Sequence, residues 1–371
     1  MKTRSINVVI LIFSFSLSII TVPCVLGIED SWVSKAPMHQ ARSGLRVAVV
    51  KDKIYAIGGA NQEGFSATTE EYDPATNTWT FKAPMPTARS AFGIAVYQNK
   101  IYCIGGYADG FSATGVNEAY TGVNEVYDPA TNTWETKTPM STPRLNIQAN
   151  VVNGEIYVIG GIPNGTVNEV YDPATDTWFT NASIPTAVSS YASAVVDNKI
   201  YVITSNLNQI YHIENDSWSY GAPPPSPAVL ASAGATTGVF TPERIYVFGA
   251  DADLPYWQLT LRNFTTQSYD PKTNNWKACA SMPTGRFDAG VAVVNDTLYV
   301  IGGFTIKFSS DRFTLNPSIT YSTVNEQYIP IGHIPEFPSW APMLVMLLAV
   351  TVVGAVYKQR LHNRNHNGEL T

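Results

Sequence analysis

The chain has 371 residues, of which 45% are apolar and only 14% are charged, and its formal net charge is −6. An acidic chain with few cations has no basic surface to offer a phosphate backbone, so these values exclude nucleic acid as a partner. The 20 tyrosines and 8 tryptophans supply aromatic area for one large packed domain.

The first 27 residues have the pattern of a secretion signal. Lys2 and Arg4 precede an apolar run over residues 6–22, and small residues follow up to Gly27. We expect cleavage after Gly27. Two alternatives stay open: Cys24 is the start of a lipid-modified protein, or the segment remains as an uncleaved anchor.

Residues 28–333 are built from one repeated unit. Six apolar strand-like runs start 44 to 55 residues apart, and most of them end in Gly-Gly. Five of the six runs are followed by a copy of the segment Val-Tyr-Asp-Pro-Ala-Thr-Asn-Thr-Trp, which is complete at residues 126–134. This period indicates a propeller or a solenoid. Alternation of apolar and polar residues, with Gly and Asp-Pro at the breaks, predicts short antiparallel strands in each unit.

These units resemble the kelch repeat, in which Gly-Gly closes the second strand and Tyr and Trp lie in the third and fourth. The resemblance extends from about Trp32 to Tyr328 and implies an all-β, six-bladed kelch β-propeller. Trp32 lies in a fourth-strand fragment with no Gly-Gly run before it, whereas no Trp follows Tyr328 in the last unit. We therefore expect the N-terminal strand to complete the sixth blade and close the ring, which leaves no free blade edge and makes a monomer the default.

Four arginines occupy equivalent positions, each twelve residues before the apolar run of its unit: Arg42, Arg89, Arg144 and Arg286. This position predicts a basic crescent at the entrance to the innermost strands, which would suit a carboxylate ligand. The same four units carry a glutamate at the start of the third strand, whereas the two units without arginine carry glutamine: Glu70, Glu125, Glu169 and Glu326 against Gln209 and Gln267. This correlation favours structural Arg–Glu pairs within each blade over direct ligand contact, because an unpaired buried carboxylate would be costly.

The loops between second and third strands, at the same end of the ring, vary most among the units and carry aromatic residues. We take these as ligand-binding candidates: Phe65, Tyr107, Phe111, Tyr256, Trp257 and Phe304. Exposed rings on loops of a rigid scaffold can stack on sugars or grip a peptide. The alternative is that the rings fold back over the ends of the blades.

Support for catalysis is weak in the sequence. Only His39, His212 and His333 remain in the exported region, at unrelated positions of the repeat and with no metal-ligand spacing, so we expect no metal, no other cofactor and no identifiable catalytic residue. Cys103 and Cys279 lie in different units, and we expect no disulfide between them. Some kelch-like propellers are enzymes, including a sialic-acid epimerase, and this implies an alternative in which the four arginines line a cofactor-free sugar-epimerase site. The main prediction is a binding or adhesion module for an extracellular carbohydrate or protein.

Residues 341–357 contain no charge, and the basic tail of residues 358–371 follows. This pattern predicts a short transmembrane helix with a cytoplasmic tail and an exported, membrane-anchored propeller at the cell surface. The Pro-rich stalk of residues 334–340 carries Pro-Glu-Phe-Pro and resembles PEF-type sorting tails of archaeal surface proteins, which implies that the anchor is processed; an ordinary stop-transfer helix is the alternative. Five glycosylation sequons are compatible with export: Asn164, Asn181, Asn215, Asn263 and Asn295.

Overall fold

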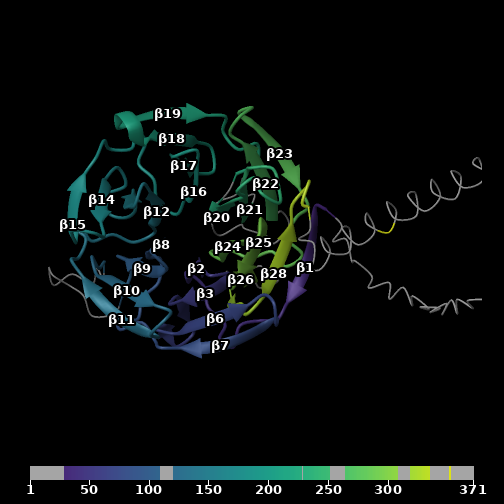
Figure 1. Ribbon diagram of the computed structural model, residues 1–371, viewed down its shortest axis with the longest axis horizontal. Coiled ribbons are helices and arrows are strands. Elements are labelled where there is room, and N and C mark those ends of the chain that lie inside the picture. Colours follow the sequence, from purple (N-terminus) through teal and green to yellow (C-terminus); the bar gives the residue numbers. More distant parts are fainter. Residues whose placement is uncertain are drawn as a thin grey trace, which may run out of the picture.

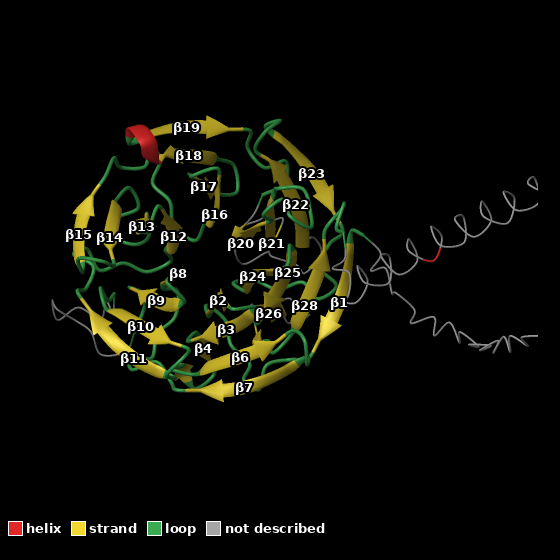
Figure 2. Ribbon diagram, viewed as in Figure 1, coloured by secondary structure: helices red, strands yellow, loops and turns green. Residues whose placement is uncertain are grey.

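The computed structural model describes residues 29–108, 120–227, 229–250, 264–307, 318–334 and Thr351. Six four-stranded antiparallel sheets surround a central axis as the blades of a propeller (Figure 1). The predicted all-β, six-bladed architecture is therefore confirmed. Of the described residues, only the 3₁₀ turn η1 (Ile213–Asn215) on the rim forms a helical element of more than one residue (Figure 2).

Four strands make up each blade, and they follow one another from the innermost to the outermost. Blade 1 contains β2 (Arg46–Val50), β3 (Lys53–Ile57), β6 (Thr69–Asp73) and β7 (Thr78–Lys82). Blade 2 contains β8 (Gly93–Tyr97), β9 (Lys100–Ile104), β10 (Asn124–Asp128) and β11 (Thr133–Lys137). Blade 3 contains β12 (Gln148–Val152), β13 (Glu155–Ile159), β14 (Asn168–Asp172) and β15 (Thr177–Thr180).

The other three blades follow the same order. Blade 4 contains β16 (Ala192–Val196), β17 (Lys199–Ile203), β18 (Asn208–His212) and β19 (Ser217–Gly221). Blade 5 contains β20 (Val229–Ala235), β21 (Ile245–Ala250), β22 (Phe264–Asp270) and β23 (Asn275–Cys279). Blade 6 contains β24 (Gly290–Val294), β25 (Thr297–Ile301), β28 (Asn325–Ile329) and β1 (Ser31–Lys35). Two small hairpins, β4 (Ala60–Asn61) with β5 (Gly64–Phe65) and β26 (Phe304–Lys307) with β27 (Ser318–Tyr321), extend blades 1 and 6.

The ring closes through strand β1, as the sequence predicts. Its residues pair antiparallel with β28, with Trp32 opposite Tyr328, although the two strands stand at opposite ends of the chain (Figure 1). The Trp32 indole also donates a hydrogen bond to the Ala280 carbonyl at the end of blade 5. Blade 6 thus contains both ends of the repeat array, and β1 covers the edge of β28 that would otherwise be unpaired.

The repeated Tyr, Asn and Trp of each unit connect neighbouring blades around the rim. In blade 2 the Tyr127 hydroxyl donates to Asn132 Oδ1 at 2.7 Å, and that oxygen also accepts the Ala83 N–H of blade 1 at 2.8 Å. The Trp134 indole donates to the Ala83 carbonyl at 2.9 Å. Asn132 has a φ of 56°, a left-handed conformation that Asn and Asp tolerate better than most residues. The equivalent Tyr, Asn or Asp, and Trp make the same contacts in every blade, so the repeated segment encodes the contact between blades.

The Gly-Gly pairs at the ends of the second strands have a similar structural cause. Gly105 has a φ of 67°, and a Cβ there would lie 2.8 Å from the carbonyl oxygen of Arg144 in the next blade. The following Gly106 N–H donates to that same carbonyl at 2.8 Å. Only glycine allows this backbone conformation and this close approach together. The apolar core is arranged accordingly, because each of its buried clusters joins the facing sheets of two neighbouring blades.

Several sequence predictions concern residues that the structure does not describe. The signal segment of residues 1–27 and the predicted membrane helix of residues 341–357 lie outside the described ranges, except for Thr351. The structure includes Ile334 but no other part of the stalk. Among the residues that are described, no helix has the length and hydropathy needed to cross a membrane.

Candidate ligand-binding face

The four repeat arginines each pair with the glutamate of their own blade. The nitrogen–oxygen distances are 2.9 Å for Arg42 with Glu70, 2.7 Å for Arg144 with Glu169 and 2.6 Å for Arg286 with Glu326, and Arg89 contacts Glu125 in the same way. All eight side chains are buried. None of the four guanidinium groups is available at the surface of this structure.

Backbone carbonyls also accept hydrogen bonds from each guanidinium. Arg42 Nη1 donates to the carbonyls of Gly58 at 2.7 Å and Thr68 at 2.9 Å, which lie on either side of the loop between the second and third strands. Burial lowers the pKa of Arg42, and the charge of Glu70 opposes this shift. The arginine therefore fixes the ends of a loop whose sequence differs from blade to blade.

In the two blades without arginine, a glutamine side chain occupies the position of the glutamate. Gln209 Oε1 accepts the Thr186 N–H at 2.9 Å, and its Nε2 donates to the Thr186 carbonyl at 3.1 Å. Gln267 makes the same two bonds with Ser226 in blade 5, at 3.1 Å and 2.9 Å. The glutamine amide thus accepts the N–H and donates to the carbonyl of a single residue, and as a neutral group it needs no cation beside it. This accounts for the correlation between Arg and Glu in the sequence.

Near the start of the innermost strand of each blade, one residue has a left-handed backbone conformation, and these six residues form a ring around the central channel. Two positions after each arginine, or its equivalent, φ lies between 46° and 61°: Gly44, Ala91, Asn146, Ser190, Leu230 and Asp288. Five backbone hydrogen bonds join neighbouring members of this ring, and one between Ser190 and Leu230 is lacking among these described residues. Sequence reasoning missed this ring because φ cannot be inferred for Ala, Ser or Leu from residue type.

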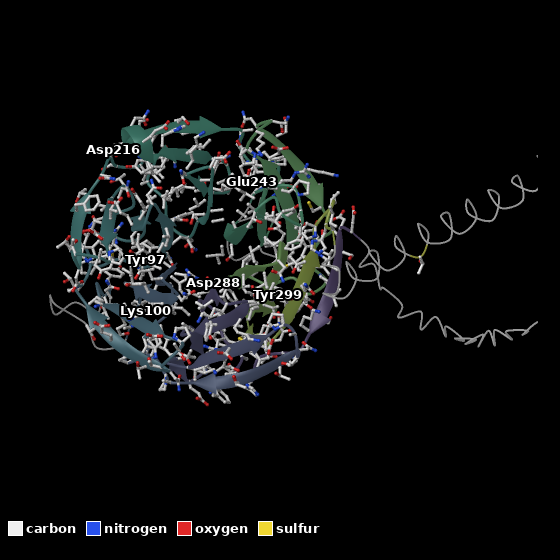
Figure 3. The ribbon with its side chains drawn as sticks, in the orientation of Figure 1. Tyr97, Lys100, Asp216, Glu243, Asp288 and Tyr299 are labelled. Carbon is white, nitrogen blue, oxygen red and sulfur yellow. The ribbon has the colours of Figure 1, made fainter. Side chains whose placement is uncertain are left out.

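Arg46 is a further arginine at this end of the molecule that the sequence analysis did not single out. It starts β2, where three of the other blades have the small residues Gly93, Ala192 and Gly290, and it donates to the Phe92 carbonyl at 2.8 Å. Its Nη1 lies 3.5 Å from the Asp288 carboxylate, which Figure 3 places near the centre of the ring. Enclosure at the channel mouth raises the pKa of Asp288, although the charge of Arg46 opposes the shift. A comparison of the first residue of the innermost strand between the units would have identified Arg46 as the charged exception.

The aromatic candidates do not behave as one group. Phe65 and Tyr107 are half-buried and meet edge-to-face, with ring centroids 5.0 Å apart, across blades 1 and 2. Phe304 is only 9% exposed and packs against Phe287, so it covers the end of blade 6 instead of forming an open surface. Phe111, Tyr256 and Trp257 lie outside the described residues.

A polar cleft opens on this face between blades 1 and 6, and we call it the blade 1/6 cleft. Its volume is about 380 Å³, within the usual range for ligand sites. The side chains that line it come from the entrance to β2, the β4–β5 hairpin and strand β27: Gln40, Asn61, Gln62, Glu63, Thr320 and Tyr321. Sequence reasoning missed the cleft, although one signal was present: Gln40 stands where four other units have Thr.

A second cleft, of about 480 Å³, lies between blades 1 and 2 at the opposite end of the strands. Two of its three lysines form ion pairs within their own repeat units: Lys53 with Asp73 at 2.7 Å and Lys100 with Asp128 at 3.7 Å. Within the described ranges, no three His, Cys, Asp or Glu side chains gather into a metal-binding group. The blade 1/6 cleft is therefore the stronger candidate for recognition, because its polar groups are less engaged.

Comparison with known proteins agrees with this architecture. A model of the KLHDC2/KLHL20/DRC7 Kelch-repeats domain matches residues 30–205. Kelch-like protein 36 of Mus musculus is 28% identical over 260 residues, which cover 69% of this chain and 34% of the mouse protein. Kelch-like protein terF of Aspergillus terreus is 28% identical over 138 residues, which cover 36% of this chain and 28% of that protein. The chain thus spans only about a third of the length of these relatives.

A solved structure has the same fold. The structure of YjhT aligns with a TM-score of 0.61 over 76% of this chain and 99% of YjhT, at 16% sequence identity. Six repeat units, a closed ring and these matches lead to one assignment. The chain belongs to the kelch-repeat β-propeller family.

Proposed function

We propose that this propeller is a binding module that captures an extracellular carbohydrate or protein through the loops at its arginine end. The observation that carries the proposal is the burial of all four repeat arginines against their glutamates, because a scaffold so fully paired leaves recognition to the residues that do not repeat. Those residues include the Phe65–Tyr107 pair and the lining of the blade 1/6 cleft. Loops on a rigid scaffold are where binding residues concentrate.

The sugar-epimerase alternative draws less support from this arrangement. It requires at least one of the four arginines to be free to contact a substrate, and each guanidinium instead donates to a carboxylate and to backbone carbonyls. Proton transfer at a sugar carbon also requires an acid or base within hydrogen-bond reach of the substrate. Burial removes Glu70 and its three equivalents from that role.

We further propose that the propeller is displayed on the outer cell surface. The support is in the sequence: a secretion-signal pattern ends at Gly27, and an uncharged segment over residues 341–357 precedes a basic tail. Proteinase added to intact expressing cells should then digest the propeller and spare a cytoplasmic marker. Protection of the propeller until the cells are lysed would contradict surface display.

The binding proposal is tested with the purified full-length chain on an array of neutral and acidic oligosaccharides and on a panel of extracellular matrix proteins. We expect binding that Tyr107→Ala on the arginine end weakens and that Tyr97→Ala, at the opposite end of β8, leaves unchanged (Figure 3). The two variants remove the same side chain, so a difference between them reports on the face. Absence of binding to every probe, or loss with Tyr97→Ala alone, would contradict the proposal.

A further inference from the structure

We infer that the blade 1/6 cleft is a subsite for a neutral, hydroxyl-rich sugar and that it discriminates against acidic sugars. The inference rests on the proposed binding function and specifies the ligand class at one place on that face. The lining combines three side-chain amides, one carboxylate, one hydroxyl and one tyrosine ring, with no cation among them. Such a set can form hydrogen bonds in both directions but has nothing to neutralise a ligand carboxylate.

The hydrogen bonds of the cleft residues direct their remaining polar atoms outward. The Glu63 N–H donates to Asn61 Oδ1 at 2.8 Å, which fixes the amide so that its NH₂ group faces away from this bond. The Thr68 hydroxyl donates to Gln40 Oε1 at 2.7 Å, which engages the oxygen of the second amide. Among the described residues, the two NH₂ groups and the Glu63 carboxylate have no hydrogen-bond or ion-pair partner. They offer donors beside an acceptor, which is the pattern that a pair of neighbouring sugar hydroxyls requires.

The negative charge of the cleft disfavours an acidic ligand. Arg42 is the nearest repeat arginine in sequence, two residues after Gln40, and its guanidinium is buried and held by Glu70. Glu63 is exposed at the turn between β4 and β5. A sugar carboxylate in the cleft would meet this negative charge, and no cation lies among the described residues that line the cleft. Placing two like charges close together is unfavourable.

Both walls of the cleft are fixed to the propeller before any ligand binds. Ser43 and Ala60 exchange two backbone hydrogen bonds, at 2.9 and 2.8 Å, which hold the β4–β5 hairpin against the entrance to β2. On the other side, the Arg42 N–H donates to the Ser322 carbonyl at 3.2 Å, directly after Tyr321. A preformed site loses less conformational entropy when it binds, and the Tyr321 ring offers a surface for the C–H face of a pyranose.

The test uses the full-length chain and an array of neutral hexose and N-acetylhexosamine oligosaccharides, together with sialylated and uronic-acid oligosaccharides. We expect binding to members of the neutral set and none to the acidic set. Glu63→Gln keeps the shape of the side chain but removes its charge, and Glu63→Lys reverses the charge. Both variants should bind the neutral ligand more weakly. For Glu63→Lys the affinity should fall by about tenfold or more, since a hydrogen bond to a charged group contributes at least that factor. Glu214→Lys, on the exposed turn η1 at the rim (Figure 2), is the matched control and should bind as the unmodified chain does.

The possible outcomes separate this inference from the broader function. Neutral-sugar binding that Tyr107→Ala abolishes and Glu63→Lys leaves intact would overturn the cleft assignment while keeping the binding face. Binding only to acidic oligosaccharides, or only to a protein, would overturn the ligand class while keeping the binding module. Equal melting temperatures of the variants would show that a loss of binding does not come from unfolding.

Discussion

Converting blade 2 into a copy of blade 4 tests the structural role of the Arg–Glu pairs. Blade 4 has Val188 and Gln209 where blade 2 has Arg89 and Glu125. We expect Arg89→Val alone to be strongly destabilising, because it leaves the Glu125 carboxylate, which is 3% exposed, without its cation. Breaking a buried ion pair in this way costs about 3–5 kcal/mol. The double variant with Glu125→Gln should recover most of that loss, because the amide can close on the Thr87 backbone as Gln209 closes on Thr186.

The magnitude can be converted into a measurable shift. At about 2.1 cal/mol/K per residue, a propeller of roughly 300 residues has an unfolding entropy of about 0.6 kcal/mol/K, so a loss of about 4 kcal/mol lowers Tm by about 6 °C. Calorimetry on the full-length chain, the two single variants and the double variant gives the coupling energy, which should be at least about 2 kcal/mol.

A matched control lies in the same blade. Lys100 and Asp128 are 3.7 Å apart and partly solvent-accessible, so removing both should leave Tm unchanged within error. Additive losses from Arg89→Val and Glu125→Gln, with no recovery in the double variant, would refute the idea that the pair holds the blade together.

Three further predictions concern closure, pH and reactivity. Trp32→Phe removes the indole donor to the Ala280 carbonyl and should lower Tm more than Phe81→Leu on the outer face of β7, as measured by thermal denaturation. Burial acts to raise the pKa of Asp296, but hydrogen bonds from the backbone N–H groups of residues 237–241 outweigh this effect and hold the pKa below its usual range. The resulting stabilisation is present above the unfolded pKa of about 3.9 and is lost as pH falls through the folded value. The difference in Tm between the unmodified chain and Asp296→Asn should therefore shrink below about pH 4. Burial raises the pKa of the Cys103 thiol to about 12, so a maleimide should modify Cys279 and leave Cys103 unreacted until the chain unfolds, as peptide mass spectrometry would show; prompt modification of Cys103 would contradict its place in the core.

Much of the fold follows from the sequence because each repeat encodes its own contacts with the next. Tyr127, Asn132 and Trp134 lie within one nine-residue segment, and their side chains make the contacts of blade 2 with blade 1. The position of Trp32, without a Gly-Gly run before it, likewise predicted closure through β1, since a four-stranded unit must find its missing strand at the other end of the array. The correlation of Arg with Glu predicted the ion pairs, and the glutamines of blades 4 and 5 follow the same rule.

The candidate site depended on tertiary structure for a physical reason: its residues come from segments that do not repeat. The sequence grouped Phe304 with the open aromatic residues, but packing against Phe287 buries it, and no local pattern distinguishes a ring that covers a blade end from one that faces solvent. Gln40 and Tyr321 line one cleft although 280 positions separate them, because closure of the ring brings blade 6 against blade 1. Repetition thus determined the scaffold from the sequence alone, whereas the contacts between its unrelated loops were decided only when the ring closed.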